Sequence, residues 1–229
     1  MANAPQAIGV DVASAGLVTA LAYRAPPRDR LGICLVLAHG AGANQKSPFM
    51  VQFATALAAR GIDTVTFNFL YTEERRRLPD RNDALEACWR AVIERFRGGI
   101  QDSGGDKLVI GGKSMGGRIA SQVAAVGRDG IAGLVLLGYP LHPPGKPQQL
   151  RIRHLPAIRA PMLFVQGERD AFGTPEELRP VIDTLTAPAE LHVVEGGDHS
   201  FKVPKKLGVP QDKVYDQVLD VITQWLRKL

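Results

Sequence analysis

The sequence predicts an α/β protein, with a doubly wound, mostly parallel sheet of about seven strands flanked by helices. Three observations predict this architecture. Short apolar segments alternate with longer segments of helical periodicity, which is typical of βαβ units. The inner short segments are apolar nearly throughout, as expected for strands covered on both faces. A length of 229 residues suits one such domain, so we expect residues 1–229 to fold as a single unit.

The strand candidates are short apolar segments, and a helix candidate lies between most neighbouring pairs. In chain order they are LVTALAY (17–23), GICLVLAH (32–39), DTVTFNF (63–69), KLVIGG (107–112), AGLVLLG (132–138), PMLFVQG (161–167) and AELHVVEG (189–196).

The helix candidates carry recognisable start and stop signals. Ser47 followed by Pro48 is typical of an N-cap and a proline in the first turn, and Gly61 follows the same helix as a stop. Residues 174–177 combine a threonine cap, a proline and two early acids. The predicted helices span residues 47–60, 82–97, 115–127, 174–185 and 212–229.

The segment 139–161 interrupts this alternation. It is rich in proline and has no clear periodicity. Because it follows a predicted strand, we expect it to lie over the carboxyl edge of the sheet, where α/β proteins bind ligands. The alternative is a plain surface loop.

Composition argues against several classes of protein. The net charge is +5 and the pI about 9.4, but the basic clusters EERRR, RIRH and KVPKK are separated and aromatic residues make up only 6%. We therefore expect no nucleic-acid partner. No apolar stretch reaches the roughly 18 residues that span a bilayer, and the first residues lack the features of a secretory signal, so no membrane association is expected. Cys34 and Cys88 lie in patterned segments, which favours buried free thiols and a cytoplasmic location.

Two glycine-rich segments could bind phosphate, but neither fits. The segment around GGKS would need a glycine at position 107 to form a phosphate-binding loop, and that position holds Lys107. The segment HGAGANQ (39–45) lacks a small residue at its last position, and the next strand ends near Asn68 rather than at an acid for a ribose. We expect neither a nucleotide cofactor nor a metal.

A different pattern fits the first of these segments. Gly112-Lys113-Ser114-Met115-Gly116 is a G-x-S-x-G sequence between a predicted strand and a predicted helix. This is the pattern of a nucleophile elbow, where glycines allow a turn sharp enough to expose the serine hydroxyl. We therefore predict that Ser114 is a catalytic nucleophile.

A serine nucleophile needs a base, and the base needs an orienting acid. Asp170 follows the strand candidate PMLFVQG, and His199 follows the next strand, so both are placed where the acid and the base of such an enzyme belong. Glu168 is the alternative acid, and His142 and His154 are the alternative bases.

The oxyanion hole needs two backbone amides. Met115, directly after the nucleophile, supplies one. The second is expected from the loop after LVLAH, where we choose Ala41 with Gly42 as the alternative.

The segments LAHGAGANQKSPFM, GGKSMGGR, QGERDAFG and GGDHSF together resemble the α/β-hydrolase superfamily, specifically its small dienelactone-hydrolase-like enzymes, over essentially the whole chain. The likeness extends to a bacterial branch related to hydrolase-like subunits of animal chromatin complexes, some of which are non-catalytic scaffolds. Dienelactone hydrolases use a cysteine nucleophile, whereas this chain has Ser114, so dienelactone is not the expected substrate. The resemblance implies serine-hydrolase chemistry on esters or related acyl compounds, and no cofactor.

We therefore predict a serine carboxylesterase that hydrolyses short-chain acyl esters, or polyesters, through an acyl-enzyme. The alternatives are a non-catalytic interaction protein with a hydrolase fold, and a thioesterase or peptidase with the same triad. The segment after the strand 132–138 is too short for a helical lid, so we expect minimal or no lid and an open groove. The residues expected to contact substrate are Gly40, Gly42, Leu70, Tyr71, Tyr139 and His142.

Overall fold

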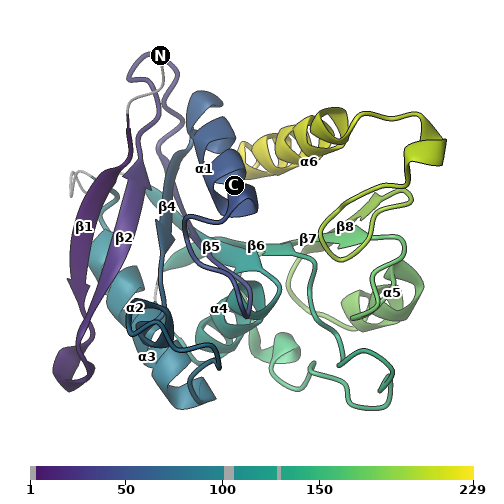
Figure 1. The fold of residues 1–229 in the computed structure, drawn as a ribbon, viewed down its shortest axis with the longest axis horizontal. Coiled ribbons are helices and arrows are strands. Elements are labelled where there is room, and N and C mark those ends of the chain that lie inside the picture. Colours follow the sequence, from purple (N-terminus) through teal and green to yellow (C-terminus); the bar gives the residue numbers. More distant parts are fainter. Residues whose placement is uncertain (1–3, 101–105, 128–129) are drawn as a thin grey trace.

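The computed structural model describes residues 4–100, 106–127 and 130–229, and its strands form a single sheet (Figure 1). The order of the strands in the sheet is β1-β2-β4-β3-β5-β6-β7-β8. Strands β3 to β8 are parallel to one another, whereas β1 and β2 form an antiparallel pair and β2 joins β4 in the antiparallel sense. The strands are β1 (Gln6–Asp11), β2 (Leu17–Tyr23), β3 (Ile33–Ala38), β4 (Asp63–Phe67), β5 (Lys107–Lys113), β6 (Ile131–Leu137), β7 (Met162–Gly167) and β8 (Ala189–Val194).

This sheet confirms the predicted fold class and all seven predicted strands, and it adds an eighth. Strand β1 escapes prediction because it lies at the edge of the sheet and most of its residues are exposed. Its sequence therefore carries no continuous apolar run, and the strand is held in place by its pairing with β2.

The five predicted helices are also present, together with one short helix that was not predicted. Helix α2 is a single turn and is too short to show a periodicity. Thr174 and Glu177 form the capping box of α5, whereas Ser47 occupies the N-cap of α1 without a side-chain hydrogen bond. The helices are α1 (Pro48–Ala59), α2 (Leu70–Glu73), α3 (Asn82–Phe96), α4 (Met115–Val126), α5 (Pro175–Ile182) and α6 (Gln211–Leu226).

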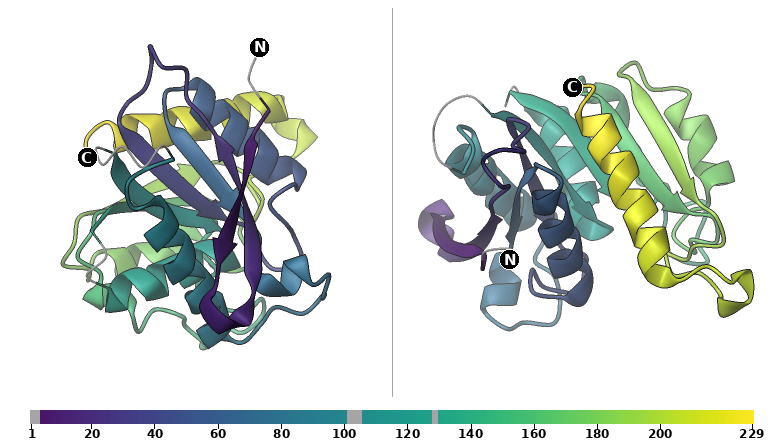
Figure 2. Two further views of the ribbon diagram at one scale, coloured as in Figure 1. Left: turned by 90° about the vertical axis from the view of Figure 1, so that its left-hand side faces the viewer. Right: turned by 90° about the horizontal axis from the view of Figure 1, so that it is seen from above.

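Helices cover both faces of the sheet, as Figure 2 shows. Helices α1 and α6 pack on one face, and α3, α4 and α5 pack on the other. Successive residues of each inner strand therefore enter different cores: Leu35 of β3 faces α1 and α6, whereas Val36 faces α3 and α4. Both faces of these strands are buried, which is why the strands read as continuous apolar runs.

The strand order reverses at β3. The chain passes from β3 to β4 on one side, then returns to β5 and continues to β8 on the other. In open α/β sheets this switch point forms a crevice at the carboxyl ends of the strands. The loop after β3 and the turn after β5 therefore lie beside each other.

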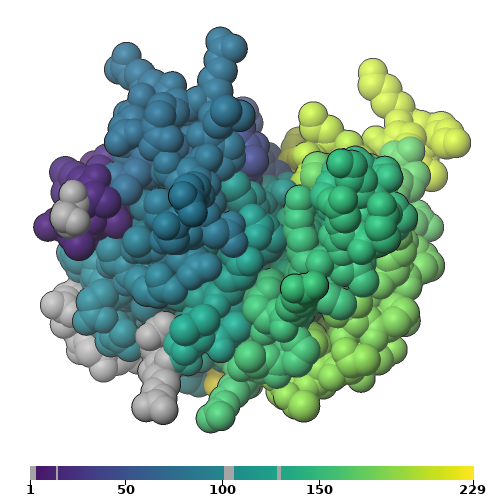
Figure 3. All heavy atoms as spheres, turned by 90° about the horizontal axis from the view of Figure 1, so that it is seen from below, coloured from purple at the N-terminus to yellow at the C-terminus, as the bar shows by residue number. Residues whose placement is uncertain are grey.

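The surface and the thiols agree with their sequence-based expectations. The basic residues 75–77 and 205–206 are exposed, and the blue and yellow-green segments that hold them project at separate places in Figure 3. Cys34 and Cys88 are free and buried. None of the helices in the described part of the chain is long and apolar enough to cross a membrane.

Trp89 connects α3 to the start of α4. Its side chain is fully buried, its Nε1–H donates to the carbonyl oxygen of Gly116 at 3.2 Å, and its ring packs edge-on against Phe67 with centroids 4.8 Å apart. It thus connects the first turn of α4 to helix α3 and to strand β4.

Trp89→Phe should lower the free energy of unfolding by about 2 kcal/mol, because it removes this hydrogen bond and part of the buried ring. Denaturant unfolding measures the loss. Arg90→Ala is the matched control, since Arg90 is exposed on the same helix and pairs with Glu86 at the surface. Its effect should stay within about 0.5 kcal/mol. Equal stability of the two variants would contradict the role of Trp89.

Candidate active site

Ser114 occupies the sharp turn between β5 and α4. Its backbone has φ 51° and ψ −116°, a conformation that non-glycine residues rarely adopt. Two hydrogen bonds hold the turn: the Ser114 N–H donates to Leu137 O at 2.9 Å, and the Arg118 N–H donates to Ser114 O at 3.0 Å. This geometry is that of the elbow predicted from the G-x-S-x-G sequence.

The glycines of the elbow allow it to pack directly on β3. A β-carbon on Gly112 or on Gly116 would collide with the backbone oxygen of Ala38. Backbone atoms of a central strand cannot move aside, so both positions require glycine. The close approach of the two backbones fixes the direction in which Ser114 points.

Asp170 and His199 lie together, as predicted. The Nδ1–H of His199 donates to Asp170 Oδ2 at 2.7 Å. The carboxylate of Asp170 is fully buried, whereas the His199 side chain is 23% exposed. The ring of Phe172 packs on the imidazole with centroids 4.3 Å apart. The acid therefore leaves the other ring nitrogen, Nε2, as the one that can accept a proton.

Gln166 holds the carboxylate from behind. This fully buried side chain donates from Nε2 to Asp170 Oδ2 at 3.0 Å and to Gly173 O at 2.7 Å. Its Oε1 accepts from the Tyr139 N–H at 2.8 Å. The Phe172 N–H donates to Asp170 Oδ1, so both carboxylate oxygens are occupied. Sequence reasoning missed Gln166 and Phe172, since neither belongs to a recognisable motif.

The loop after β3 approaches Ser114. A β-carbon on Gly40 would lie 3.4 Å from Ser114 Cβ. The neighbouring His39 is buried, which lowers its pKa, and its Nδ1–H donates to Gly40 O at 2.8 Å. Ala41 and Met115 both line the cavity around Ser114. Met115 is the first residue of α4, where backbone N–H groups have no partner within the helix.

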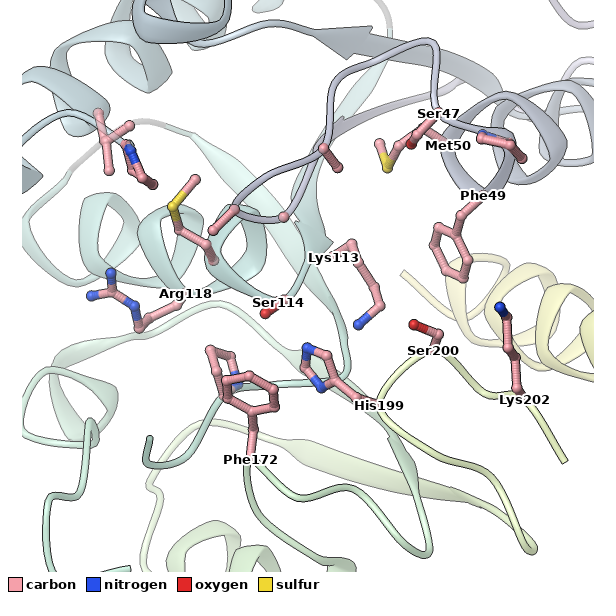
Figure 4. A pocket seen from close by; sticks show the side chains of 18 of the residues that line it. Ser47, Phe49, Met50, Lys113, Ser114, Arg118, Phe172, His199, Ser200 and Lys202 are labelled. Carbon is pink, nitrogen blue, oxygen red and sulfur yellow. The ribbon is translucent and has the colours of Figure 1, made fainter. Parts of the chain in front are cut away.

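The elbow opens into a cavity of about 760 Å³, a size typical of small-molecule sites. Figure 4 shows the Ser114 hydroxyl and the His199 ring pointing into it. Phe49 and Met50, at the start of α1, form one apolar wall, and Phe172 contributes to the opposite side.

Five of the six residues expected to contact substrate do not line this cavity. Of the six, only Gly40 is a lining residue. The side chains of the larger residues are buried in the core or in the loop after β6, where they pack against other parts of the protein. The five residues outside the cavity are Gly42, Leu70, Tyr71, Tyr139 and His142.

The alternative acid and bases are also accounted for. Glu168 is exposed, and its Oε2 accepts from the Gly196 N–H at 2.6 Å. His142 Nε2 lies 3.3 Å from Glu177 Oε1, and His154 Nε2 lies within hydrogen-bond distance of the Ser121 hydroxyl at 2.8 Å. None of the three lines the cavity.

The segment between β6 and β7 covers one edge of the cavity without forming a lid domain. Residues 138–161, all described by the structure, contain one short 3-10 helix and no α-helix. Pro140 and Arg151 line the cavity, and Tyr139 ties the segment together by donating from its hydroxyl to Arg151 O at 2.6 Å. The expectation of minimal or no lid is confirmed.

Lys113, which precedes Ser114, has an unusual environment. Its side chain lines the cavity, yet the residue is only 9% exposed and its Nζ has no hydrogen-bond partner in the described structure. Burial lowers its pKa to about 8, against the opposing effect of Asp170 and Asp198. Desolvating an unpaired ammonium costs folding free energy, so Lys113 destabilises the fold.

Lys113→Met should stabilise the protein at neutral pH by about 2–3 kcal/mol, because it removes the charge but keeps an unbranched side chain. The pKa of this lysine is about 8 in the folded protein and 10.5 as its ordinary value. Between these values the unfolded chain binds more protons, so the wild type gains stability as the pH rises.

The advantage of the variant should therefore be complete below pH 8 and vanish near pH 10.5. Denaturant unfolding of both proteins across this range measures the difference. A difference that does not change with pH would contradict a charged, buried Lys113.

Comparisons with known proteins agree with this fold. The chain is similar in structure to an alpha-beta serine hydrolase homologue from Coxiella burnetii, with a TM-score of 0.75, 20% identity, and 99% of this chain and 98% of that chain covered. It is similar to dienelactone hydrolase from Anabaena variabilis, with a TM-score of 0.74, 21% identity and 97% of each chain covered. A serine hydrolase without lid from Xanthomonas campestris has a TM-score of 0.68, 20% identity and 88% coverage of each chain.

These structural likenesses, at such low identity, concern the fold. The assignment to a family comes from the sequence itself, because the family model described as an alpha/beta hydrolase domain matches residues 32–227. That range contains the elbow, the loop after β3, and both Asp170 and His199. The chain therefore belongs to the α/β-hydrolase family.

Proposed function

We propose that this protein is a serine carboxylesterase in which Ser114, His199 and Asp170 form the catalytic triad. The observation that carries the proposal is the 2.7 Å hydrogen bond between His199 Nδ1 and the buried Asp170, at the same cavity as the strained Ser114. A strained serine beside an oriented imidazole has no role in stability, but it is what nucleophilic catalysis needs. The serine hydrolases among the similar structures accord with this proposal.

The chemical steps follow from the placement of these groups. His199 Nε2 takes the proton of Ser114 as Oγ attacks the ester carbonyl, and Asp170 stabilises the imidazolium that forms. The N–H groups of Ala41 and Met115 donate to the oxyanion. His199 then protonates the departing alcohol, and a water molecule, activated by the same imidazole, hydrolyses the acyl-enzyme.

The cavity supports a preference for short acyl groups. Its cover consists of one irregular segment without an α-helix, so a long acyl chain would gain little burial there. An open site of this kind also admits a bulky alcohol, or a segment of a polyester. Thioesters and amides remain alternative substrates of the same triad, and matched thioesters and amides test them directly.

Ser114→Ala should lower the rate of ester hydrolysis by about 10⁴-fold or more and abolish labelling by a fluorophosphonate probe, because triad members act as a unit. Asp170→Asn should also cost several orders of magnitude, since it allows the wrong tautomer of His199. Glu168→Gln, an exposed change on the same loop, is the control and should change the rate less than about threefold. A wild-type protein that the probe does not label would favour the non-catalytic interaction protein.

Among p-nitrophenyl esters of increasing acyl length, acetate and butyrate should give the highest kcat/KM, because longer chains gain little burial in an open site. The rate should not jump when the substrate exceeds its solubility limit, since no lid has to open. Initial rates across acetate, butyrate, octanoate and laurate check this. An optimum at laurate with such a jump would contradict the preference.

A further inference from the structure

The charges that line the cavity are predominantly positive. Lys113, Arg118, Arg151 and Lys202 all contribute to its wall, against the single carboxylate of Asp80. Asp80 is already occupied, because it pairs with Arg76 at 2.6 Å and accepts from the Tyr71 N–H at 3.0 Å. The field inside the cavity therefore favours a negatively charged guest.

Among these cations, Lys113 has a buried Nζ with no hydrogen-bond partner in the described residues, and an aromatic ring rather than a carboxylate faces it. Its Nζ lies 5.7 Å from the centroid of the Phe201 ring, and a β-carbon on Gly138 would lie 2.8 Å from it. Figure 4 shows the side chain reaching into the space between His199 and Ser200. No carboxylate in the described residues lies within ion-pair distance of this ammonium.

The two nearest acids cannot move to serve it. Both oxygens of Asp170 are held, by Gln166 and His199 on one and by a backbone N–H on the other. Asp198 Oδ1 accepts the backbone N–H groups of Ser200 at 2.7 Å and Lys202 at 3.0 Å, which fixes the loop that carries His199. The nearest acids therefore cannot pair with this ammonium, and we expect its partner to come from a bound ligand.

An uncompensated ammonium at this place also opposes the proposed chemistry. A β-carbon built on Gly138 would lie 3.4 Å from His199 Cε1 and 2.8 Å from Lys113 Nζ, so the two side chains are close neighbours. When His199 becomes an imidazolium, two positive charges face each other in a poorly solvated cavity. A substrate that brings a negative group to Lys113 removes this repulsion in the step in which it matters.

We propose that the substrates of this enzyme are esters that carry an anionic group, and that Lys113 is the residue that binds it. The inference rests on the proposed esterase function and narrows its substrate class. Arg118 lies on the far side of Ser114 from Lys113 (Figure 4). The anion bound by Lys113 therefore occupies only the part of the cavity on the Lys113 side of Ser114.

The position of Lys113 limits where the anion sits on the substrate. Because Lys113 directly precedes Ser114 in the chain, the charged group must lie within a few bonds of the reacting carbonyl. A single ammonium beside the aromatic rings of Phe49 and Phe201 suits a compact monoanion rather than a multiply charged group. A carboxylate meets both conditions, as in the monoesters of short dicarboxylic acids.

The matched substrates are monoethyl succinate and ethyl butyrate, which differ by a carboxylate in place of a methyl group. With the wild type, kcat/KM from ethanol release should be about tenfold or more higher for monoethyl succinate. Lys113→Met should abolish this preference, so that the ratio of kcat/KM for the two esters falls to about one. Lys46→Met removes an exposed lysine that does not line the cavity and should keep the preference.

Ethyl phosphonopropanoate, which carries a phosphonate in place of the carboxylate, tests whether the site prefers a carboxylate or a more highly charged anion. Hydrolysis slower than that of monoethyl succinate supports the carboxylate, whereas faster hydrolysis that also depends on Lys113 overturns the carboxylate assignment.

A binding measurement separates this inference from the esterase proposal. Calorimetry of monoethyl succinate with Ser114→Ala should show binding that weakens about tenfold or more when Lys113→Met is added. Equal binding to the single and double variants, or equal rates on both matched esters, overturns the inference even if the fluorophosphonate probe labels Ser114. If the probe fails but the binding difference holds, the esterase proposal falls and the anion site stands.

Discussion

The site depends on one close contact, where the first turn of α4 meets the end of β3 with no side chain between them. Gly112 and Gly116 both face the backbone oxygen of Ala38 at distances that exclude a β-carbon. That contact sets the path of the chain through Ser114 and aims its hydroxyl out of the sheet. It also places the Met115 N–H at the cavity and brings the loop after β3 against the serine. Trp89 adds a side-chain hydrogen bond to the same turn.

The parallel order of the strands brings the other residues of the site together. Strands β3, β5, β7 and β8 all end at the same edge, so the segments that follow them meet there although they lie far apart in the sequence. Two buried ionisable side chains in this region, Asp170 and Lys113, have opposite hydrogen-bonding environments. The carboxylate of Asp170 receives hydrogen bonds on both oxygens, whereas the ammonium of Lys113 receives none from the protein. The hydrogen bonds to Asp170 suit its proposed role in orienting His199, and the missing partner of Lys113 is the basis of the proposed anion site.

The sequence predicts those parts of the structure that follow local rules. The inner strands are recognisable because burial on both faces makes them apolar throughout, and the elbow because sterics demand glycine at fixed spacing. The edge strand β1 and the one-turn helix α2 leave no such pattern. The lining of the cavity is harder still, since it depends on which loop residues turn inward: Tyr139 and His142 turn into the protein, whereas Phe172 turns toward His199. The lack of a hydrogen-bond partner for Lys113 also depends on its neighbours in space, so the sequence alone does not predict it.

Gln166 makes one side of the cavity more rigid than the other. One amide side chain bonds the backbone of Tyr139 through both its nitrogen and its oxygen, and also bonds Asp170 and Gly173. The loop after β6 is therefore coupled rigidly to the acid of the proposed triad, and a shift of that loop would disturb the imidazole as well. We expect substrates of different sizes to be accommodated at the opposite wall, formed by the first turn of α1, which carries no member of the proposed triad. A change of substrate range would thus begin at α1.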